Sequence, residues 1–279
     1  MKSCIYGLVR GYKDLSKYNQ LINRNLSISK FINFNNHDMI IFHEGNIEKE
    51  HQSHIRSKSK NEQIKFINIK KDFENSDSEI VAHENLTNNS PGGHSIYLGA
   101  KNMFRFYSMR CFAYLDEYDY IMRADEDILF ANVLGYDIFD FMKSNNLILG
   151  YGYRKIDGHP LATTIIPYIK KYIEQKQITT HCSGKEININ HFYSNLSIYK
   201  TSFWKKPECL GYLKYMHDSE GIYSKRWGDH IIHSNAIKMF SHPDQWHRFK
   251  DLQYQHQSLA WDSQKNIKQE WEIDRSKYK

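Results

Sequence analysis

Short apolar runs alternate with amphipathic segments along the first 180 residues. Runs such as CIYGLVR (4–10), DMIIFHE (38–44) and IKFINI (64–69) have the length and composition of strands. Apolar residues recur at helical spacing in 13–26 and, over the longest stretch, in 97–115. The same patterns predict further strands at 118–130 and 147–153, a strand and turn within 190–204, and helices at 135–145, 163–176, 210–221 and 228–240.

The alternation of strand and helix patterns predicts an α/β fold with a mixed, mainly parallel sheet flanked by helices. Such folds bind ligands outside the carboxyl ends of their strands. The chain of 279 residues carries no Gly-rich dinucleotide fingerprint after its first strand and no Walker A sequence. Other residues must therefore hold any phosphate groups. The Asn-, Ser- and Asp-rich segment 72–95, which ends in NSPGGH, is predicted to be a loop.

Composition narrows the class of partner. The net charge of +6 mildly favours an anionic ligand, but no dense Lys/Arg run is present, so a nucleic acid partner is not predicted. The 20 Tyr, 15 Phe and 5 Trp fit either a Tyr-rich core or a site that stacks sugars and nucleotides. Four widely spaced cysteines without a C-x-x-C pair argue against structural zinc.

Three consecutive acidic residues follow an apolar run in YDYIMRADEDILF (118–130): Asp125, Glu126 and Asp127. Burying three close carboxylates is unfavourable unless a cation relieves their repulsion. Mg²⁺ and Mn²⁺ prefer oxygen ligands and often combine one or two carboxylates with substrate phosphates. A D-x-D at a strand end thus predicts a metal–diphosphate site, with an acidic surface turn as the alternative. Arg123 shares a strand face with Asp125, where it would pair with the carboxylates or approach a phosphate.

A second constellation is RWGD (226–229) at the start of an amphipathic helix. Asp229 stands where an N-cap or first-turn acid is favoured, and capping alone would explain it. The functional alternative is a carboxylate that accepts a hydroxyl proton or steadies a positive centre. His230 and His233 are spaced i, i+3, but nothing like H-E-x-x-H is present, so we expect His233 to be packed and hydrogen-bonded within the domain. His256 is a candidate metal ligand or a surface histidine.

Several segments together resemble the α-1,2-mannosyltransferases of glycosyltransferase family 15, the Kre2/Mnt1 type, in order and approximate spacing. The resemblance covers residues 97–258 and rests on MFRFYSMRCF, YDYIMRADEDILF, YDIFDFMKSNN, HFYSNLSIYKTSFW and GIYSKRWGDHIIHSNAIKMF. It implies one GT-A-like domain over 1–279, with a nucleotide-binding part (1–130) and an acceptor and catalytic part (131–279). It also implies Mn²⁺ (or Mg²⁺), a nucleotide-sugar donor that is GDP-mannose in the family, and retaining transfer to a hydroxyl of a glycan or protein-linked acceptor.

The resemblance also assigns positions. Asp125 falls on the family's metal-binding Glu, Asp127 follows in register, and His256 falls on a further metal-ligand histidine. Asp229 matches an active-site Asp. Substrate-binding positions are then Arg105 and Arg123 beside the diphosphate, with Tyr193, Asn195, Arg226 and Trp227 in the two later motifs.

Two departures stand out. The family's F-W-S-N-F-E-I motif reads Phe192–Ile198 here, and Ser197 replaces the Glu proposed as nucleophile. A serine without an adjacent base is a poor nucleophile, so a front-face mechanism, in which the leaving phosphate takes the acceptor proton, is the alternative to double displacement. A catalytically silent nucleotide-sugar or glycan-binding protein is the second hypothesis, and a metal-dependent phosphoesterase the third.

The second departure is the missing N-terminal anchor expected of Golgi family members. The sequence begins as a strand and holds no run of about 20 apolar residues, so no transmembrane segment is predicted. The Asn-, Ile- and Lys-heavy composition suggests an AT-rich genome, such as that of a large DNA virus. We therefore expect a cytoplasmic location, the host cytoplasm for a viral protein, with the Golgi lumen as the alternative if an anchor was removed.

Overall fold

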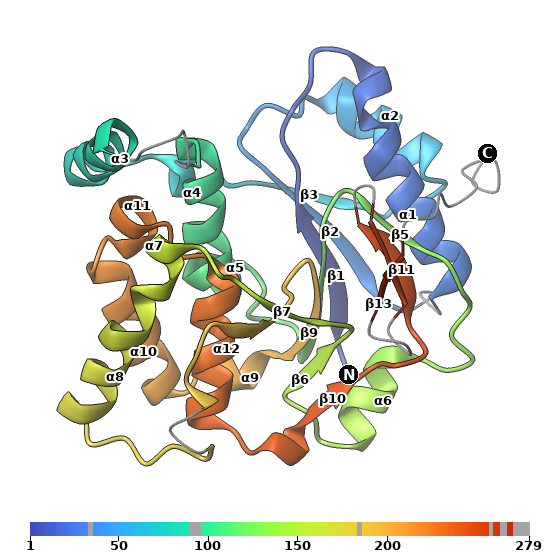
Figure 1. The fold of residues 1–279 in the computed structure, drawn as a ribbon. Coiled ribbons are helices and arrows are strands. Elements are labelled where there is room, and N and C mark those ends of the chain that lie inside the picture. Colours follow the sequence, from blue (N-terminus) through green and yellow to red (C-terminus); the bar gives the residue numbers. More distant parts are fainter. Residues whose placement is uncertain (33–35, 90–95, 183–185, 257–258, 263–266, 270–279) are drawn as a thin grey trace.

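The computed structural model describes residues 1–32, 36–89, 96–182, 186–256, 259–262 and 267–269. Its centre is a seven-stranded sheet (Figure 1). In spatial order the strands are β10 (Trp246–Arg248), β6 (Leu149–Tyr151), β9 (Leu196–Lys200), β4 (Tyr120–Ala124), β1 (Ser3–Leu8), β2 (Asp38–His43) and β3 (Lys65–Asn68). Only β9 runs antiparallel to its neighbours in this sheet. The predicted mixed, mainly parallel sheet is confirmed.

Helices cover both faces of the sheet (Figure 1). One face carries α1 (Asn19–Phe31), preceded by a 3-10 turn at Leu15–Tyr18, with α2 (Lys49–Lys58) and α6 (Ile138–Ser144). The other carries α4 (Leu98–Arg105), a π-helical turn (Phe106–Arg110), α5 (Cys111–Tyr114), α8 (Ile165–Gln175), α9 (Thr201–Trp204), α10 (Pro207–Asp218), α11 (Gly221–Lys225) and α12 (Asp229–Phe240). Short pieces complete the set: α7 (Pro160–Thr163) and 3-10 turns at Lys70–Phe73 and Pro243–Gln245.

Strand alternation determines which side chains meet each helical layer. In β4, Met122 packs with the α1 face while Ile121 packs with the α12 face. Arg123 therefore points toward α12. Ser197 of β9 lies opposite Arg123 in the ladder, so the two share that face. The sheet thus brings Arg123 and Ser197, 74 positions apart in the chain, to the same face, which lines the candidate site described below.

Two smaller sheets extend the fold. β5 (Ile128–Phe130), β11 (Gln253–His256), β12 (Leu259–Asp262) and β13 (Ile267–Gln269) form an antiparallel sheet, and β7 (Arg154–Ile156) pairs with β8 (Asn190–Phe192). His256 lies opposite Ile128 in the β5–β11 ladder. This register places His256 beside the acidic triplet, which immediately precedes β5.

The predicted loop at 72–95 is wrong over most of its length, because Asp77–Asn89 form the helix α3. Its start is a capping box: the Glu79 amide donates to Ser76 Oγ at 3.3 Å, and the Ser76 amide donates to the Glu79 carboxylate at 3.0 Å. Packing against α11 stabilises a segment with few apolar residues. The end of the predicted loop, 90–95, lies outside the described residues.

Likewise, the segment 190–204 contains two strands and the short helix α9, where one strand and a turn were predicted. All four cysteines are free and buried. Among the residues that the structure describes, no helix combines the length and the apolar character needed to cross a bilayer.

Candidate active site

Arg123 is the centre of the site and is 4% exposed. Its Nε donates to Asp125 Oδ1 at 2.8 Å, and its Nη1 donates to Asp229 Oδ2 at 2.6 Å. Nη1 also lies 3.3 Å from Ser194 Oγ, and the guanidinium carbon stands 3.5 Å from the ring centre of Tyr107. One guanidinium therefore joins the end of β4 to the start of α12 and rests on an aromatic face.

The geometry decides between the two interpretations of Asp229. The N-cap of α12 is Gly228, without a side-chain cap hydrogen bond, and Asp229 is the first helical residue. Its carboxylate turns to Arg123 and accepts a second bond from Ser194 Oγ at 3.1 Å. Capping therefore does not account for Asp229, although the positive end of the helix favours its charge.

Burial and the nearby positive charge have opposite effects on the pKa values of Asp125 and Asp229. Burial alone would raise the pKa of Asp229, but Arg123, His230, His233 and the Ser194 hydrogen bond together outweigh it, and the pKa lies below the usual range. Burial raises the pKa of Asp125, and Arg123 offsets only part of that effect. A single cation between two buried acids leaves one negative charge in excess, and Asp125 carries the penalty. The surroundings therefore favour the ionised form of Asp229 more strongly than that of Asp125.

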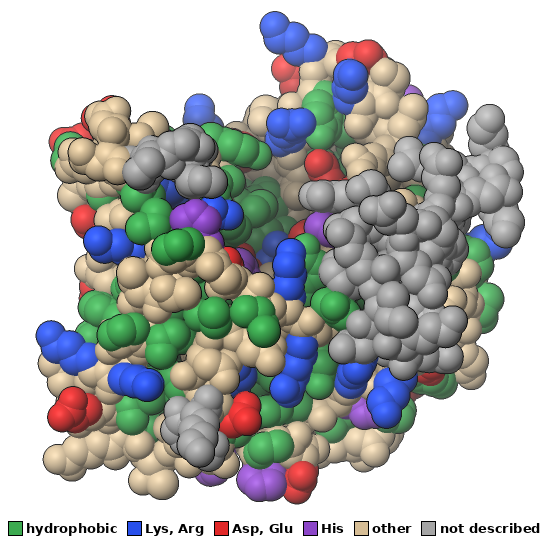
Figure 2. Space-filling model, viewed as in Figure 1, with side chains coloured by type: hydrophobic (Ala, Val, Ile, Leu, Met, Phe, Trp, Pro, Cys, Tyr) green, Lys and Arg blue, Asp and Glu red, His purple; other side chains and the backbone are tan. Residues whose placement is uncertain are grey.

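Asp127 and His256 form a second pair beside this cluster. Asp127 Oδ1 lies 3.2 Å from His256 Nε2, and both side chains are mostly buried. His256 Nδ1 is buried without a hydrogen-bond partner in the described part of the chain. Figure 2 shows the surface hollowed between the flank of α3, α4 and α11 and the flank of α1 and α2, with acidic and histidine side chains visible around the hollow.

The predicted three-ligand metal set is only partly assembled. In the described ranges, no group of three or more His, Cys, Asp or Glu side chains is arranged to hold a metal ion. Arg123 binds both oxygens of Asp125, at 2.8 and 3.3 Å, and the role of Asp125 as a metal ligand stays a prediction. Asp127 and His256 do fit a divalent cation, since Mn²⁺ accepts carboxylate and imidazole ligands and commonly completes its shell with phosphate oxygens and water.

A close approach of backbone and guanidinium supports the acidic turn from below. Arg24 of α1 is fully buried and its Nη1 donates to the carbonyl of Ala124, the residue before the triplet, at 2.7 Å. This contact needs Gly7 in β1, because a Cβ there would stand 2.6 Å from both Ala124 O and Arg24 Nη1. On the outer side, the Tyr12 hydroxyl donates to Glu126 at 3.2 Å. The acidic triplet is thus a half-buried, supported element rather than the free surface turn that was the alternative.

The segment 193–197 lines the same site. The Asp125 amide donates to the Asn195 carbonyl at 3.1 Å, and the Tyr254 hydroxyl donates to Asn195 Oδ1 at 3.4 Å. Burial, then the charges of Asp125 and Asp127, raises the pKa of Tyr193 to about 12. Ser197 is 1% exposed, and its hydroxyl donates to the Ser194 carbonyl at 3.5 Å. Ser197 thus lies at the floor beside Arg123, and its hydroxyl bonds a backbone carbonyl there.

Both predicted diphosphate arginines have other partners. Arg105 is 2% exposed, binds Glu79 at 2.6 and 2.7 Å, and donates to the carbonyls of Asp72 and Glu74. It ties α4 to α3 and the preceding turn. The donors of Arg123 point at carboxylates and Ser194. Both buried guanidinium groups are thus satisfied by nearby acids, carbonyls and a hydroxyl, and their role beside a diphosphate stays a prediction.

The two remaining predicted substrate residues lie outside the carboxylate cluster. Trp227 is 4% exposed, donates to Thr164 Oγ1 at 2.9 Å and packs on Tyr168, which is a core role. Arg226 is half-buried with φ +61°, and its charge helps to lower the pKa of Asp157, behind the larger effect of hydrogen bonding to His230. Neither contacts the acidic triplet in an observed bond.

Sequence reasoning missed Tyr107, Arg24 and Ser194 as members of the site. Ser194 stands inside the HFYSN motif, and Tyr107 inside MFRFYSMRCF, so the motif boundaries were the available signal. Nothing in the sequence connects Arg24 to a carbonyl 100 positions later.

His233 is packed as predicted, with its ring against Trp204, Phe112 and Tyr199 and its Nε2 donating to the Ser108 carbonyl at 3.0 Å. Burial, the main cause, lowers the pKa of His233 from 6.5 to about 4. Between these values the unfolded chain binds a proton that the folded chain does not. Stability is therefore lost as pH falls from 6.5 toward 4, by about 3 kcal/mol from this residue.

Urea unfolding of the parent and of His233→Gln at pH 7 and pH 4.5 measures how much His233 contributes to the loss of stability in acid. Gln keeps an N–H donor for the Ser108 carbonyl but does not titrate, so the variant should lose less stability in acid than the parent. Equal losses in the two proteins would assign acid sensitivity to the carboxylates instead.

Comparison with known sequences gives a consistent result. The profile of the family described as glycolipid 2-alpha-mannosyltransferase matches residues 1–276. The glycolipid 2-alpha-mannosyltransferase of Saccharomyces cerevisiae is 30% identical over 155 residues, 51% of this chain and 34% of that protein. The Candida albicans glycolipid 2-alpha-mannosyltransferase 2 is 30% identical over 152 residues, 51% of this chain and 33% of that protein. The matched region thus spans about a third of the length of these relatives.

Solved structures show the same fold. Core-mannan synthase A of Aspergillus fumigatus, in its Mn/GDP form, has a TM-score of 0.81 at 20% identity, covering 93% of this chain and 76% of that one. The mannosyltransferase Ktr4p of Saccharomyces cerevisiae has a TM-score of 0.81 at 21% identity, covering 93% and 71%.

The expectation of a cytoplasmic location is wrong. It rested on the lack of an anchor in this sequence, whereas the related yeast mannosyltransferases belong to the Golgi lumen. Because the match covers only part of those relatives, the start of this sequence carries no information on location. With its profile matched from residue 1 to residue 276 and its fold shared with two mannosyltransferases, the chain belongs to the glycolipid 2-alpha-mannosyltransferase family.

Proposed function

We propose that this chain is a metal-dependent retaining glycosyltransferase that moves mannose from GDP-mannose to a hydroxyl of a glycan or protein-linked acceptor. The observation that carries the proposal is the Asp127–His256 pair beside the Arg123-centred carboxylates, at the carboxyl end of β4. The family membership and the Mn/GDP form of the Aspergillus neighbour support the choice of sugar, nucleotide and metal.

In this proposal Asp127 and His256 hold the cation, with residues 1–130 supplying the nucleotide-binding part and 131–279 the acceptor part. Bound Mn²⁺ would stabilise the charge that develops on the leaving diphosphate. Asp229, kept ionised by Arg123, presents a fixed negative charge to the reacting sugar, where positive charge develops. Asp125 holds Arg123 from the other side and so positions Asp229.

A front-face route suits these residues better than double displacement. In it the bond between the sugar C1 and the diphosphate oxygen breaks, a bond from C1 to the acceptor oxygen forms on the same face, and the acceptor proton passes to the leaving phosphate. This route needs no enzyme nucleophile. Ser197 supports it, because its hydroxyl is buried and donates to the Ser194 carbonyl, which cannot act as a base toward it.

Ser197→Ala is therefore expected to keep kcat within about threefold of the parent, since only one long hydrogen bond is lost. Steady-state transfer from GDP-mannose to a mannoside measures this. The matched control is Ser194→Ala, which removes a bond to Asp229 and is expected to lower kcat about tenfold. A loss of 1,000-fold or more in Ser197→Ala alone would restore the nucleophile role, as such losses follow removal of a covalent nucleophile.

A thermal-shift screen of nucleotide diphosphate sugars with and without Mn²⁺ tests the donor assignment. A ligand that binds the folded state raises its apparent stability, so GDP-mannose with Mn²⁺ should give the largest shift. Shifts by another nucleotide sugar, or shifts that ignore Mn²⁺, would contradict the proposal.

The second candidate is a catalytically silent nucleotide-sugar or glycan-binding protein, which Ser197 in place of the family's Glu favours. Donor binding by calorimetry without transfer or donor hydrolysis over a broad acceptor panel would select it.

A further inference from the structure

Three neighbouring parallel strands, β4, β1 and β2, end side by side at the edge of the sheet that carries the candidate site (Figure 1). The acidic triplet follows β4, Arg10 follows β1, and Glu44 follows β2. Since neighbouring strands are about 4.8 Å apart, β2 lies roughly 10 Å from β4. A ligand that begins at the Asp127–His256 pair and extends along this edge therefore meets residues of β1 and then of β2.

Glu44 is a half-buried carboxylate. Phe42 of β2 packs in the apolar layer of α4 and α12, whereas His43 turns to the opposite layer, where its Nδ1 accepts from the Ile47 amide at 3.4 Å. The alternation directs Glu44 to the α4 side, the side on which Arg123 lies. Burial raises the pKa of Glu44, and no hydrogen bond or ion pair from the described residues offsets this effect. A ligand that donates hydrogen bonds to Glu44 would relieve this penalty.

Two glycines fix the backbone around Glu44. Gly45 has φ +83°, a left-handed conformation that glycine adopts without strain, and a Cβ there would stand 3.2 Å from the side chain of Asn68. A Cβ on Gly11 would stand 2.0 Å from the carbonyl oxygen of Asn46, so the loops after β1 and β2 are in close contact. The ends of β1, β2 and β3 therefore form one packed wall that carries Glu44.

Arg10 supplies positive charge between the metal pair and Glu44. Its guanidinium carbon lies 5.0 Å from the ring centre of Tyr12. Hydrogen bonding to Tyr12 is the main cause that raises the pKa of Arg10, and the nearby Glu126 and Tyr97 add to it. In the described part of the chain no acid forms an ion pair with Arg10. Tyr97, which precedes α4 on the other flank of the hollow, is 74% exposed and offers an aromatic face.

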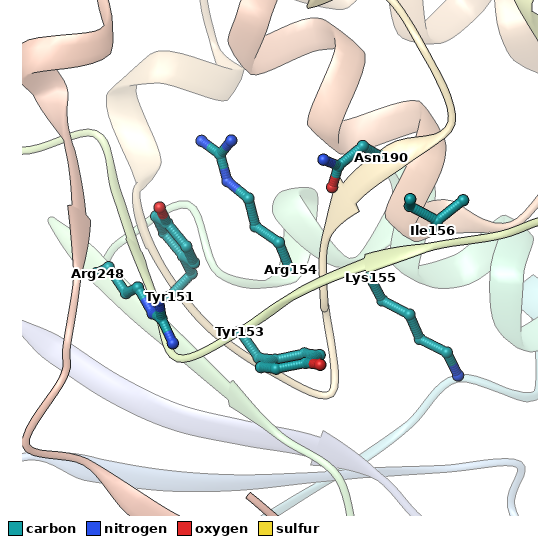
Figure 3. A pocket seen from close by; sticks show the side chains of 7 residues that line it. All are labelled: Tyr151, Tyr153, Arg154, Lys155, Ile156, Asn190 and Arg248. Atoms are coloured by element: carbon teal, nitrogen blue, oxygen red, sulfur yellow. The ribbon is translucent and has the colours of Figure 1, made fainter. Parts of the chain in front are cut away.

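The cavity of about 640 Å³ beside the β7–β8 ribbon lacks this arrangement. Figure 3 shows that two of its cations, Arg154 and Lys155, project to opposite sides of the ribbon. Arg248 donates to the Gly152 carbonyl at 3.3 Å. These cations do not converge on one anion, so the edge formed by β4, β1 and β2 is the better place for a nucleotide.

We propose that Glu44 recognises the guanine base of the donor by accepting hydrogen bonds from guanine N1–H and N2–H. The assignment rests on the proposed function, which places the diphosphate at the cation held by Asp127 and His256. Among the common bases, guanine presents two adjacent donors on one edge, and a single carboxylate can accept both. Uracil and adenine turn carbonyl oxygens or a ring-nitrogen lone pair to the same position, where the negative charge of Glu44 would repel them.

A ribose diol is the alternative partner of Glu44. In dinucleotide-binding folds the diphosphate lies at the first strand, and an acid after the second strand binds the ribose. Here the diphosphate is assigned to the end of β4, one strand further from β2. The ribose therefore falls beside Arg10 at β1, and the base reaches Glu44 at β2.

Calorimetry on the full chain with Mn²⁺ tests the base assignment with GDP, inosine diphosphate, 2′-deoxy-GDP and UDP. Inosine diphosphate lacks only the N2 amino group, so the parent should bind it about tenfold or more weakly than GDP. Glu44→Gln should weaken GDP by about tenfold or more and bring GDP and inosine diphosphate within about threefold of each other. Glu50→Gln, an exposed acid in the first turn of α2, is the matched control and should keep the parental affinities.

Unfolding without a nucleotide separates recognition from a structural role. Glu44→Gln should be at least as stable as the parent in urea, because it replaces a half-buried carboxylate by a neutral group. Lower stability with parental discrimination between GDP and inosine diphosphate would overturn the proposal. Glu44→Asp keeps the charge but shortens its reach, so it should also lose discrimination and provides the test if Glu44→Gln does not fold.

The nucleotide panel distinguishes failure of this assignment from failure of the proposed function. A parent that binds UDP as tightly as GDP would contradict the proposed donor and the role of Glu44 with it. A parent that selects GDP over UDP but not over inosine diphosphate would overturn the role of Glu44 alone. If Glu44→Gln instead loses discrimination between GDP and 2′-deoxy-GDP, Glu44 binds the ribose and the base assignment is wrong.

Discussion

Replacing Arg123 by Met is expected to lower the free energy of unfolding by about 3–5 kcal/mol and to abolish sugar transfer. The guanidinium is 4% exposed and holds Asp125 and Asp229 by bonds of 2.8 and 2.6 Å. Met fills a similar volume over Tyr107 but leaves two buried acids without a cation. Removing one partner of a buried ion pair is costly because the other charge remains out of water. Urea unfolding and transfer assays at pH 7 measure both effects.

The loss should depend on pH in a direction that identifies its cause. Without Arg123, burial is the largest influence on both Asp125 and Asp229 and only weaker effects oppose it. Their pKa values should rise, so protonation relieves the penalty. The variant should therefore recover part of its stability deficit relative to the parent as pH falls from 7 to 5.

Arg123→Lys is the matched control. It keeps the positive charge but cannot bind two carboxylates and an aromatic face at once. We expect an intermediate stability loss and low activity. Full stability and activity in Arg123→Met would show that the cluster is neither structural nor part of the reaction.

The second large effect is expected at the metal pair. Asp127→Asn should lower kcat at least 1,000-fold, because the cation supplies several kcal/mol of charge stabilisation to the leaving diphosphate. Its folding cost should be only about 1 kcal/mol, because Asn has nearly the same size and keeps an oxygen that can accept from His256. Transfer kinetics over a Mn²⁺ titration measure the loss of activity, and thermal unfolding measures the loss of stability.

Thermal shifts test the metal-binding role of Asp127 and His256 independently of activity. Asp127→Asn and His256→Gln should each remove the Mn²⁺-dependent part of the thermal shift with GDP-mannose. Asp218→Asn, an exposed acid on α10, is the control and should behave as the parent. A Mn²⁺-dependent shift of parental size in both site variants would place the metal at other residues.

The sequence was sufficient to predict those features that depend on a local pattern of residues. The apolar run in 118–130 predicted the strand β4, and the acidic triplet was correctly set at the end of that strand. The packed His233 and the long helical segment from 97 to 115 also follow from spacing alone. The capping box at Ser76 and Glu79 was a local signal too, and it was overlooked.

Only the tertiary structure decided which partner each charged side chain binds. Arg105 and Arg123 are both arginines in predicted motifs. Arg105 binds Glu79 on α3, whereas Arg123 binds both Asp125 and Asp229, the latter 106 positions away in the chain. A buried guanidinium must be satisfied by the acceptors that the folded chain brings nearest, and those depend on packing rather than spacing.

The acidic triplet shows both sides of this division. Three carboxylates at a strand end already implied a compensating cation, because their burial is otherwise too unfavourable. The sequence could not say that Arg123 would neutralise Asp125 and leave Asp127 to meet His256, since that pairing depends on the β5–β11 register. The sequence thus determined the strand, its faces and the need for positive charge. The tertiary structure decided that Arg123 neutralises Asp125, and that Asp127 pairs with His256 where a ligand cation can bind.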